Sequence, residues 1–299
     1  MSSKNAIVYA VYSDKEDFEN LLQWREIQYS VKTLREYNKD IDIKIYVAPE
    51  INVAKAVGLE KFDNVEVISL ELPEMGPEWI NKTIAKWLAM KWNAAFKALE
   101  VFKYDSVLMV DPDTVFQKNP QYIFEKYNDG SIYARPEDWK DFVVDFLKIS
   151  RPVMNDGIVL IPKRYLKAKD LLLEQRNLFS FKLADEYRST EGDLGFYWNR
   201  GIWWASFQYG ISEYLNNAFD PVKYFDIMDV STLRDFEKIP NQEERDEVCL
   251  IHYFSIGVKK FLPNKWLGDI DTNEMQNYIG KSSHWEIAEL NINNSSVYE

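Results

Sequence analysis

The sequence has a single cysteine, and it contains no hydrophobic run of the roughly 18 residues that a membrane-spanning helix needs. One cysteine excludes a disulfide framework within the chain. Cys249 lies in the apolar run 248–251, which favours a buried, unreactive thiol. The N-terminus passes into a strand-like segment without a secretory leader. These absences predict a cytoplasmic protein that is not anchored to a membrane.

Positive charge is scarce as well, because 36 Lys and Arg residues stand against 48 Asp and Glu residues, a net charge of −12. Binding to nucleic acid depends on basic residues that neutralise phosphates along a continuous face. The composition therefore argues against a nucleic-acid partner. An anionic ligand must be held locally, by a metal ion or by a few lysines.

Hydrophobic residues, in contrast, make up 46% of the 299 residues, which is enough to bury a full core and excludes a disordered or fibrous chain. Aromatic residues account for 15% of the chain. Trp139, Trp203 and Trp204 fall in segments without a core pattern. We interpret these rings either as stacking platforms for sugars or as ordinary core and interface residues.

Short apolar runs alternate with longer segments of helical period in the first two-thirds of the chain, which is typical of βαβ units around a mainly parallel sheet. The predicted strands span residues 6–12, 43–47, 65–70, 106–110 and 157–161. The predicted helices lie between the first two strands and over 81–102. Beyond Pro162 the pattern predicts a helix over 165–178, a mixed aromatic segment over 192–207 and a strand over 248–254.

The strongest motif is the run 107–115, in which an apolar strand ends in Asp111 and Asp113. Two carboxylates this close repel each other, so a cation or solvent must compensate. Mg²⁺ and Mn²⁺ take oxygen ligands and keep positions open for phosphates, and such a metal neutralises a departing diphosphate. Asp-Pro-Asp is also good turn chemistry, so a purely structural turn is the alternative.

An apolar strand followed by Asp-x-Asp-Thr-Val also resembles the nucleophile motif of haloacid-dehalogenase-like phosphatases. Asp111 would then be phosphorylated, Asp113 would be the acid and base, and 191–193 would supply the later acidic motif. In those enzymes the strand normally opens its domain, whereas a long βαβ pattern precedes it here. A phosphatase is therefore the second choice.

His252 is one of only two histidines, and it lies in the predicted strand over 248–254. Neutral imidazole suits Mn²⁺ better than Mg²⁺. Gly257, Lys259 and Lys260 follow, and they offer backbone groups and positive charge to a diphosphate. A lone strand histidine is often a core residue, but the Asp-x-Asp motif favours a metal ligand here.

Together these motifs resemble the retaining glycosyltransferases of the GT-A fold, in particular glycosyltransferase family 8, which contains glycogenin and bacterial lipopolysaccharide galactosyl- and glucosyltransferases. The resemblance covers roughly residues 6–261. It implies an α/β fold with a mainly parallel central sheet flanked by helices. It also implies a UDP-sugar donor, Mn²⁺ (or Mg²⁺) as cofactor, and transfer to a hydroxyl of a glycan, protein or lipid-linked acceptor.

The resemblance assigns the metal ligands and the diphosphate site. The implied metal ligands are Asp111, Asp113 and His252. The family's His-x-x-Gly-x-x-Lys motif is two residues longer here between His252 and Gly257. Either Lys259 or Lys260 is therefore the lysine that the family places at the diphosphate.

Two further family motifs concern the donor sugar. Asn-x-Gly matches Asn155 and Gly157, which implies that Asn155 lies near the sugar, although these residues also read as a simple turn. Asp-Gln-Gly matches 193–195, which implies that Asp193 binds sugar hydroxyls at the reacting face. Leu194 replaces the glutamine, and this keeps open a catalytically silent nucleotide-sugar binding protein.

The uracil contacts of the family fall at Tyr12 and Asp14, although Asp14 also fits as the N-cap of the next helix. No linker divides the sequence, so one GT-A domain is predicted. Residues 1–115 form its nucleotide-binding part, 116–270 its donor-sugar and acceptor part, and 271–299 a C-terminal extension.

The family also places a basic residue on the helix before the Asp-x-Asp strand, where it reaches the donor. Lys91 is our first choice and Lys86 our second, and a solvated surface lysine is the alternative for each. Arg135 and Asp138 follow the next strand, where the family frames the donor sugar.

Overall fold

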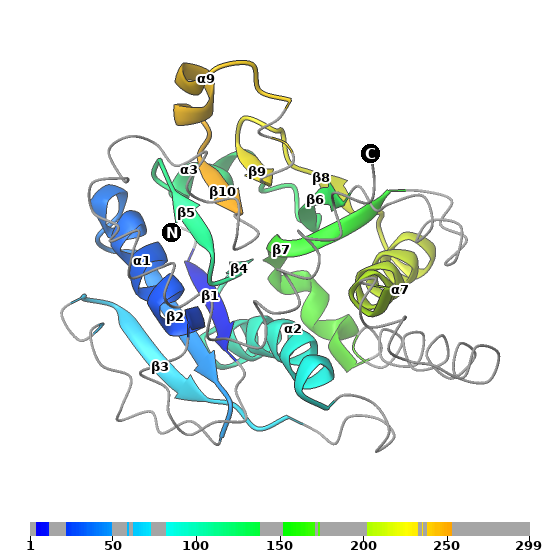
Figure 1. The fold of residues 1–299 in the computed structure, drawn as a ribbon. Coiled ribbons are helices and arrows are strands. Elements are labelled where there is room, and N and C mark those ends of the chain that lie inside the picture. The colour runs from blue at the N-terminus through cyan, green and yellow to red at the C-terminus, as the bar shows by residue number, and fades with distance from the viewer. Residues whose placement is uncertain are drawn as a thin grey trace, which may run out of the picture.

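The structure is a computed structural model that describes residues 4–11, 22–49, 59, 62–72, 82–137, 152–170, 173, 202–232, 235 and 238–252. A seven-stranded sheet with the order β3-β2-β1-β4-β7-β6-β8 forms its centre (Figure 1). Its strands are β1 (Asn5–Val11), β2 (Asp42–Val47), β3 (Val65–Ser69), β4 (Ser106–Val110), β6 (Tyr133–Glu137), β7 (Val153–Pro162) and β8 (Lys223–Tyr224).

Among these strands β7 runs opposite to the others, because it is antiparallel to both β4 and β6, whereas the pairs β1–β2, β2–β3, β1–β4 and β6–β8 are parallel. The predicted mainly parallel sheet is therefore confirmed. Residues 6–11 of β1 are all buried, as expected for a strand with both faces covered.

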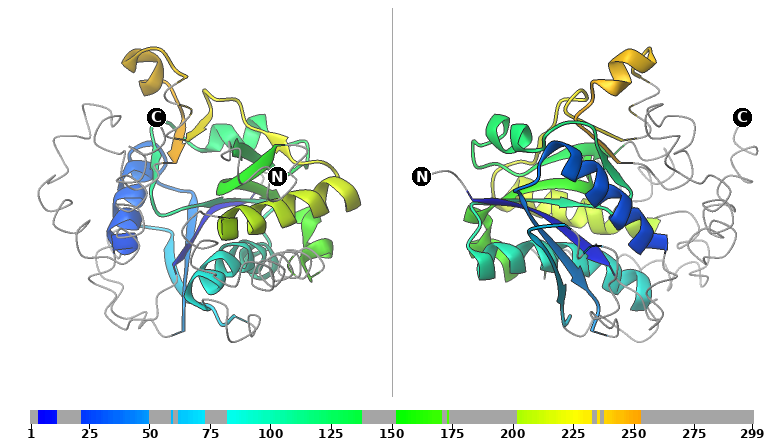
Figure 2. Two further views of the ribbon diagram at one scale, coloured as in Figure 1. Left: turned by 45° about the vertical axis from the view of Figure 1, so that its right-hand side comes forward. Right: turned by 90° about the vertical axis from the view of Figure 1, so that its left-hand side faces the viewer.

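Helices cover both faces of the sheet. α1 (Leu22–Tyr37) connects β1 to β2, and α2 (Lys82–Phe102) precedes β4. Figures 1 and 2 show α1 on one face, with α2 and α7 (Ile202–Ala218) on the other. Four buried alanines let α2 approach the sheet closely: Ala89, Ala94, Ala95 and Ala98. The chain thus changes faces between β1 and β4, and ligands of open α/β folds bind at the carboxyl end of such a switch point.

A second, three-stranded sheet with the order β5-β10-β9 lies beside the switch point. Its strands are β5 (Thr114–Phe116), β9 (Val230–Thr232) and β10 (Leu250–His252). The remaining helices are α3 (Gln121–Lys126), the 3₁₀ helix η3 (Lys163–Ala168) and α9 (Gln242–Asp246). α1 packs on β5, where the hydroxyl of Thr33 accepts a hydrogen bond from the amide of Phe116 (3.1 Å).

A buried ion pair joins the two sheets. The Arg135 guanidinium on β6 binds Asp235, with Nε at 3.1 Å and Nη2 at 3.0 Å from its carboxylate oxygens, and it also donates to the carbonyl of Phe225. Asp235 accepts the amide of Thr232, the last residue of β9 (2.9 Å). Burial by itself raises the pKa of Asp235, but Arg135 and Thr232 lower it overall, so the carboxylate is charged.

The structure corrects two details of the sequence interpretation. β7 begins at Val153, so Asn155, Asp156 and Gly157 lie within a strand and not in a turn before one. Side chains from neighbouring elements bind the two polar residues, which lets a strand contain them. The helix predicted over 165–178 begins as the 3₁₀ helix η3, and most of its second half lies outside the described residues.

No helix in the described parts of the chain is both long enough and apolar enough to cross a bilayer.

The buried thiol of Cys249 yields a first prediction. Burial, helped by the charge of Asp229, raises the pKa of the Cys249 thiol to about 12, so the reactive thiolate is rare at neutral pH. We expect a disulfide reagent such as DTNB to label the native protein at least roughly tenfold more slowly than the guanidinium-unfolded protein. The chain has one cysteine, so the absorbance reports this site alone. Equal rates in the two states would contradict the buried position.

Candidate metal centre

Asp111 and Asp113 lie at the carboxyl end of β4, at the switch point of the sheet. The amide of Asp111 donates to the carbonyl of Gly157 on β7 (2.7 Å), and the amide of Thr114 donates to the carbonyl of Asp111 (3.2 Å). Residues 111–114 therefore do form a tight turn between β4 and β5. The same turn directs both carboxylates to one place, so the two interpretations of Asp-Pro-Asp are compatible.

His252 reaches these carboxylates through the small sheet. β10 is antiparallel to β5, with His252 paired to Thr114, the residue after Asp113. The imidazole Nε2 lies 3.2 Å from Asp113 Oδ1 and 3.4 Å from Asp111 Oδ2. One ligand atom from each of the three residues lies within 4.8 Å of the others. The fold thus brings together the three residues that the sequence analysis named as candidate metal ligands.

Gly157 makes room for the imidazole. A Cβ atom at this position would lie 2.1 Å from His252 Cε1 and 2.3 Å from Nδ1. Both distances are far below van der Waals contact, so a residue with a side chain at 157 would displace the ring. The glycine is required here by close packing.

Lys91 supports the centre from α2. Its ammonium is 2.7 Å from Asp111 Oδ1 and 3.2 Å from Asp156 Oδ1, and its side chain is only 3% exposed. Gln208 on α7 donates to the same oxygen of Asp156 (2.9 Å). The two carboxylate oxygens of Asp111 therefore have different partners, because Oδ1 contacts the Lys91 ammonium and Oδ2 faces the His252 imidazole.

The electrostatics of these groups are strongly coupled. Burial lowers the pKa of Lys91, but Asp111 and Asp156 raise it overall, so the lysine is a cation. Burial likewise lowers the pKa of His252, but Asp113 and Asp111 outweigh it and raise the pKa to about 10. Glu26 on α1 belongs to the same field, since burial and then the charges of Asp113 and Asp111 raise its pKa well above the usual range.

These residues fit a divalent metal. Among the described residues, the carboxylates of Asp111 and Asp156 contact the ammonium of Lys91, and Asp113 lies beside His252. With a neutral His252 imidazole, the three aspartates and Lys91 carry three negative charges and one positive charge. A divalent cation balances the difference of two. Two carboxylates and one imidazole form a donor set that suits Mn²⁺.

No protein-family model matches the sequence, and no curated protein sequence matches it. Solved structures do match. Mouse xyloside xylosyltransferase 1 in its apo form superposes with a TM-score of 0.51 at 11% identity, over 83% of this chain and 97% of that chain. The bifunctional glycosyltransferase WbbM gives 0.50 at 10% identity, over 85% of this chain and 46% of that chain.

The chain has the GT-A fold. The galactosyltransferase LgtC, solved with donor and acceptor sugar analogs, also matches, with a TM-score of 0.49 at 15% identity, over 89% of this chain and 100% of that chain. The Asp-Asp-His cluster lies at the carboxyl end of the GT-A sheet, where open α/β folds bind their ligands.

The structure describes only some of the other predicted site residues. Asn155 is buried; its amide nitrogen donates to Glu137, and its oxygen accepts the amide of Gly157 (2.9 Å). Arg135 is buried and binds Asp235, so its guanidinium links the two sheets. Lys86 lies on α2 with its side chain outside the described atoms. Tyr12, Asp14, Asp138, Asp193, Gly257, Lys259 and Lys260 lie outside the described residues.

Three residues of this cluster were not identified from the sequence: Glu26, Asp156 and Gln208. The sequence held a signal for Glu26, because the polar residues Ser30 and Thr33 follow it at helical spacing on one face of α1. The structure shows that both are fully buried. Buried polar residues along one helix face indicate a polar surface opposite. Asp156 was seen only as part of a turn, and Gln208 had no local signal.

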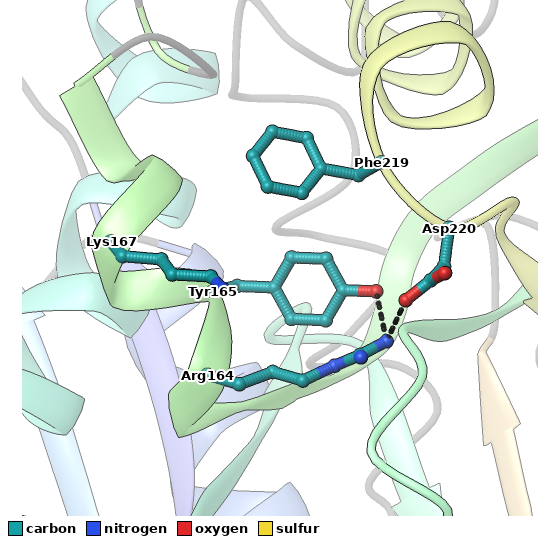
Figure 3. Close-up of a pocket in the computed structure, with 5 residues that line it drawn as sticks. All are labelled: Arg164, Tyr165, Lys167, Phe219 and Asp220. Atoms are coloured by element: carbon teal, nitrogen blue, oxygen red, sulfur yellow. Dashed lines mark hydrogen bonds and ion pairs between the residues drawn. The ribbon is translucent and has the colours of Figure 1, made fainter.

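A pocket of about 130 Å³ lies away from this centre, and Figure 3 shows its five lining residues. They are Arg164, Tyr165, Lys167, Phe219 and Asp220. η3 follows Pro162, which pairs with Ser106 at the start of β4. The pocket therefore lies near the amino end of β4, whereas Asp111 follows its carboxyl end. The Arg164 guanidinium is bound by Asp220 and by the hydroxyl of Tyr165 (3.1 Å). We assign this pocket no part in the chemistry.

The contact between Gly157 and His252 yields a second prediction. Gly157→Ala should weaken Mn²⁺ binding about tenfold or more in calorimetric titration, because the new methyl group displaces a ligand. Gly130→Ala is the matched control. Gly130 has φ +81°, so this change should cost about 1–2 kcal/mol of stability and leave Mn²⁺ affinity unchanged. Wild-type affinity in Gly157→Ala would refute the packing argument.

The proton on His252 yields a third prediction. Its folded pKa of about 10 exceeds the ordinary histidine pKa of 6.5, so protonation stabilises the metal-free fold below about pH 6.5, and this contribution is lost as pH rises to about 10. A metal must displace this proton, so apparent Mn²⁺ affinity should rise about tenfold per pH unit within that window.

Calorimetry in buffers of different ionisation enthalpy measures the proton directly. Wild-type protein should release about one proton per Mn²⁺ bound, and His252→Gln should bind more weakly with no such release. A flat pH dependence without proton release in the wild type would contradict the assignment.

Proposed function

We propose that this chain is a metal-dependent glycosyltransferase that moves a sugar from a UDP-sugar to an acceptor hydroxyl, with retention of configuration. The observation that carries the proposal is the cluster of Asp111, Asp113 and His252 at the carboxyl end of a GT-A sheet. The structural likeness to a xylosyltransferase and to a bifunctional glycosyltransferase supports sugar transfer as the reaction class.

Asp111, Asp113 and His252 would hold the metal, and the donor set favours Mn²⁺. When bound, this cation supplies Lewis-acid stabilisation of the charge that develops on the departing nucleoside diphosphate. The ammonium of Lys91 contacts one oxygen of the Asp111 carboxylate and leaves the other oxygen facing His252, while Asp156 balances the charge of the lysine. This role replaces the direct donor contact that the resemblance implied for Lys91.

The remaining donor contacts are assigned from the sequence. β1 is parallel to β4 and ends at Val11, so its carboxyl end lies at the same edge as Asp111, and Tyr12 and Asp14 come next in the chain as proposed uracil contacts. We assign the diphosphate to Gly257, Lys259 and Lys260. Asn155 and Asp193 are proposed near the donor sugar, and the acceptor is a glycan, a protein or a lipid-linked molecule.

The two other functions make different predictions for the same cluster. A phosphatase would use Asp111 as a nucleophile, but its side chain is only 11% exposed, with one carboxylate oxygen bound to Lys91 and the other facing His252. A silent binding protein would take up UDP with metal and release no sugar. Turnover assays separate all three.

The metal ligands yield a fourth prediction. Asp113→Asn should lower metal-dependent hydrolysis of the UDP-sugar by about a hundredfold or more, because Lewis-acid stabilisation is worth several kcal/mol. Asp105→Asn is the matched control. Asp105 precedes β4 as Asp111 follows it, is exposed and accepts the amide of Lys4 (2.9 Å). Unchanged turnover in Asp113→Asn would contradict the assignment of Asp113 as a metal ligand.

Nucleotide binding provides the direct test of the donor. Thermal unfolding is measured with UDP and with GDP, each with and without Mn²⁺, and UDP-sugars are then assayed for slow hydrolysis. Stabilisation by UDP only with Mn²⁺ is expected, at about 2.7 kcal/mol when UDP is present at a hundred times its Kd. Cleavage of a phosphomonoester without nucleotide binding would instead identify a phosphatase.

A further inference from the structure

We propose that Asp156, held by Gln208, is a positioning residue that sets the affinity of the metal centre without touching the metal. It does so as the second counter-charge of Lys91. This inference rests on the metal centre proposed above, and it adds a residue that the sequence resemblance did not assign a role.

The contacts form a chain across three elements. The Lys91 ammonium on α2 lies between Asp111 Oδ1 (2.7 Å) and Asp156 Oδ1 (3.2 Å), and Gln208 on α7 donates to Asp156 Oδ1 (2.9 Å). Lys91, Asp156 and Gln208 are 2%, 5% and 7% exposed. An amide and an ammonium thus converge on one buried carboxylate oxygen.

Gln208, on α7, is held in place by hydrogen bonds that link α7 to β7. The hydroxyl of Ser212, one turn later on α7, donates to the carbonyl of Gln208 (2.8 Å) and accepts the amide of Met154 (3.1 Å). Met154 lies two residues before Asp156 on β7. These hydrogen bonds hold α7 against β7 beside Asp156. They therefore fix the position of the Gln208 backbone, from which its side chain reaches Asp156.

Charge explains why a second carboxylate is needed. A divalent cation and the Lys91 ammonium both depend on Asp111, since one carboxylate oxygen faces Lys91 and the other faces His252 and Asp113. If Asp156 were neutral, Asp111 and Asp113 would offer two negative charges to three positive charges. With Asp156 the charges of these described groups balance, and imbalance is costly in a buried site.

A purely structural Lys91–Asp156 pair predicts a different behaviour. In that case Asp156→Asn lowers stability, and removing Lys91 as well does not repair metal binding. In the positioning role the defect of Asp156→Asn is an excess positive charge, so removing Lys91 cancels it. The double variant therefore separates the two roles.

The experiment is a calorimetric Mn²⁺ titration of four proteins: wild type, Asp156→Asn, Lys91→Met and Lys91→Met/Asp156→Asn. Asp156→Asn should bind Mn²⁺ about 10–100-fold more weakly, the range typical of groups one shell removed from a metal. The double variant should return to within about threefold of wild type. Lys91→Met alone should bind no more weakly than wild type.

Lys44→Met is the matched control, because Lys44 is also a buried lysine paired with a carboxylate, Glu66 (2.7 Å), on the strands β2 and β3 away from the centre. It should leave Mn²⁺ affinity unchanged. Thermal unfolding in EDTA verifies that each variant is folded. If Asp156→Asn does not fold, Gln208→Leu is titrated in its place, and it should bind Mn²⁺ severalfold more weakly.

The outcomes separate the two proposals. Wild-type protein that binds no Mn²⁺ overturns the metal centre and the proposed function with it. Wild-type binding with unchanged affinity in Asp156→Asn overturns the positioning role alone. The same holds if the double variant binds as weakly as Asp156→Asn, or if a folded Gln208→Leu binds like wild type.

Discussion

One buried ammonium group holds the centre of this protein together. Lys91 joins α2 to the end of β4 through Asp111 and to the start of β7 through Asp156, and Gln208 extends the contact to α7. Removing one member of such a buried group typically costs about 3–5 kcal/mol, because the remaining charge is left without compensation. A protein of ordinary stability has only about 5–15 kcal/mol in total. The arrangement of the site and the stability of the fold therefore depend on the same contacts.

The site is assembled from two sheets, and this places demands on parts of the chain that never contact a ligand. Asp111 follows a strand of the large sheet, whereas His252 ends a strand of the small one, and the pairing of His252 with Thr114 sets their separation. Arg135 and Asp235 connect β6 to the end of β9, which is the other neighbour of β10. Arg135 thus resembles a donor-binding residue in sequence and serves as a link between the sheets in the structure.

Sequence patterns predicted the features that are encoded locally. β4 has the predicted bounds, because four apolar residues run directly into the Asp-x-Asp motif, and the three proposed metal ligands were named from their residue types and from the family resemblance. The direction of β7 had no local signal, since its apolar pattern is the same in a parallel or an antiparallel strand. Asn155, Asp156 and Gly157 were expected to form a turn because their partners, Glu137, Lys91 and His252, come from distant segments. The proposed role of Asp156 and Gln208 depends on tertiary contacts, which the local sequence does not show.

The order of the ligands along the chain has a consequence for biosynthesis. Asp111 and Asp113 emerge from the ribosome long before His252, which lies near the end of the described fold. At synthesis rates of about 5–20 residues per second, the two aspartates wait on the order of ten seconds for their third partner. During that interval the Asp-Asp-His cluster lacks its third member. In the proposed metal centre the third ligand joins only when β10 has paired with β5, so a chain that stops before β10 lacks that ligand.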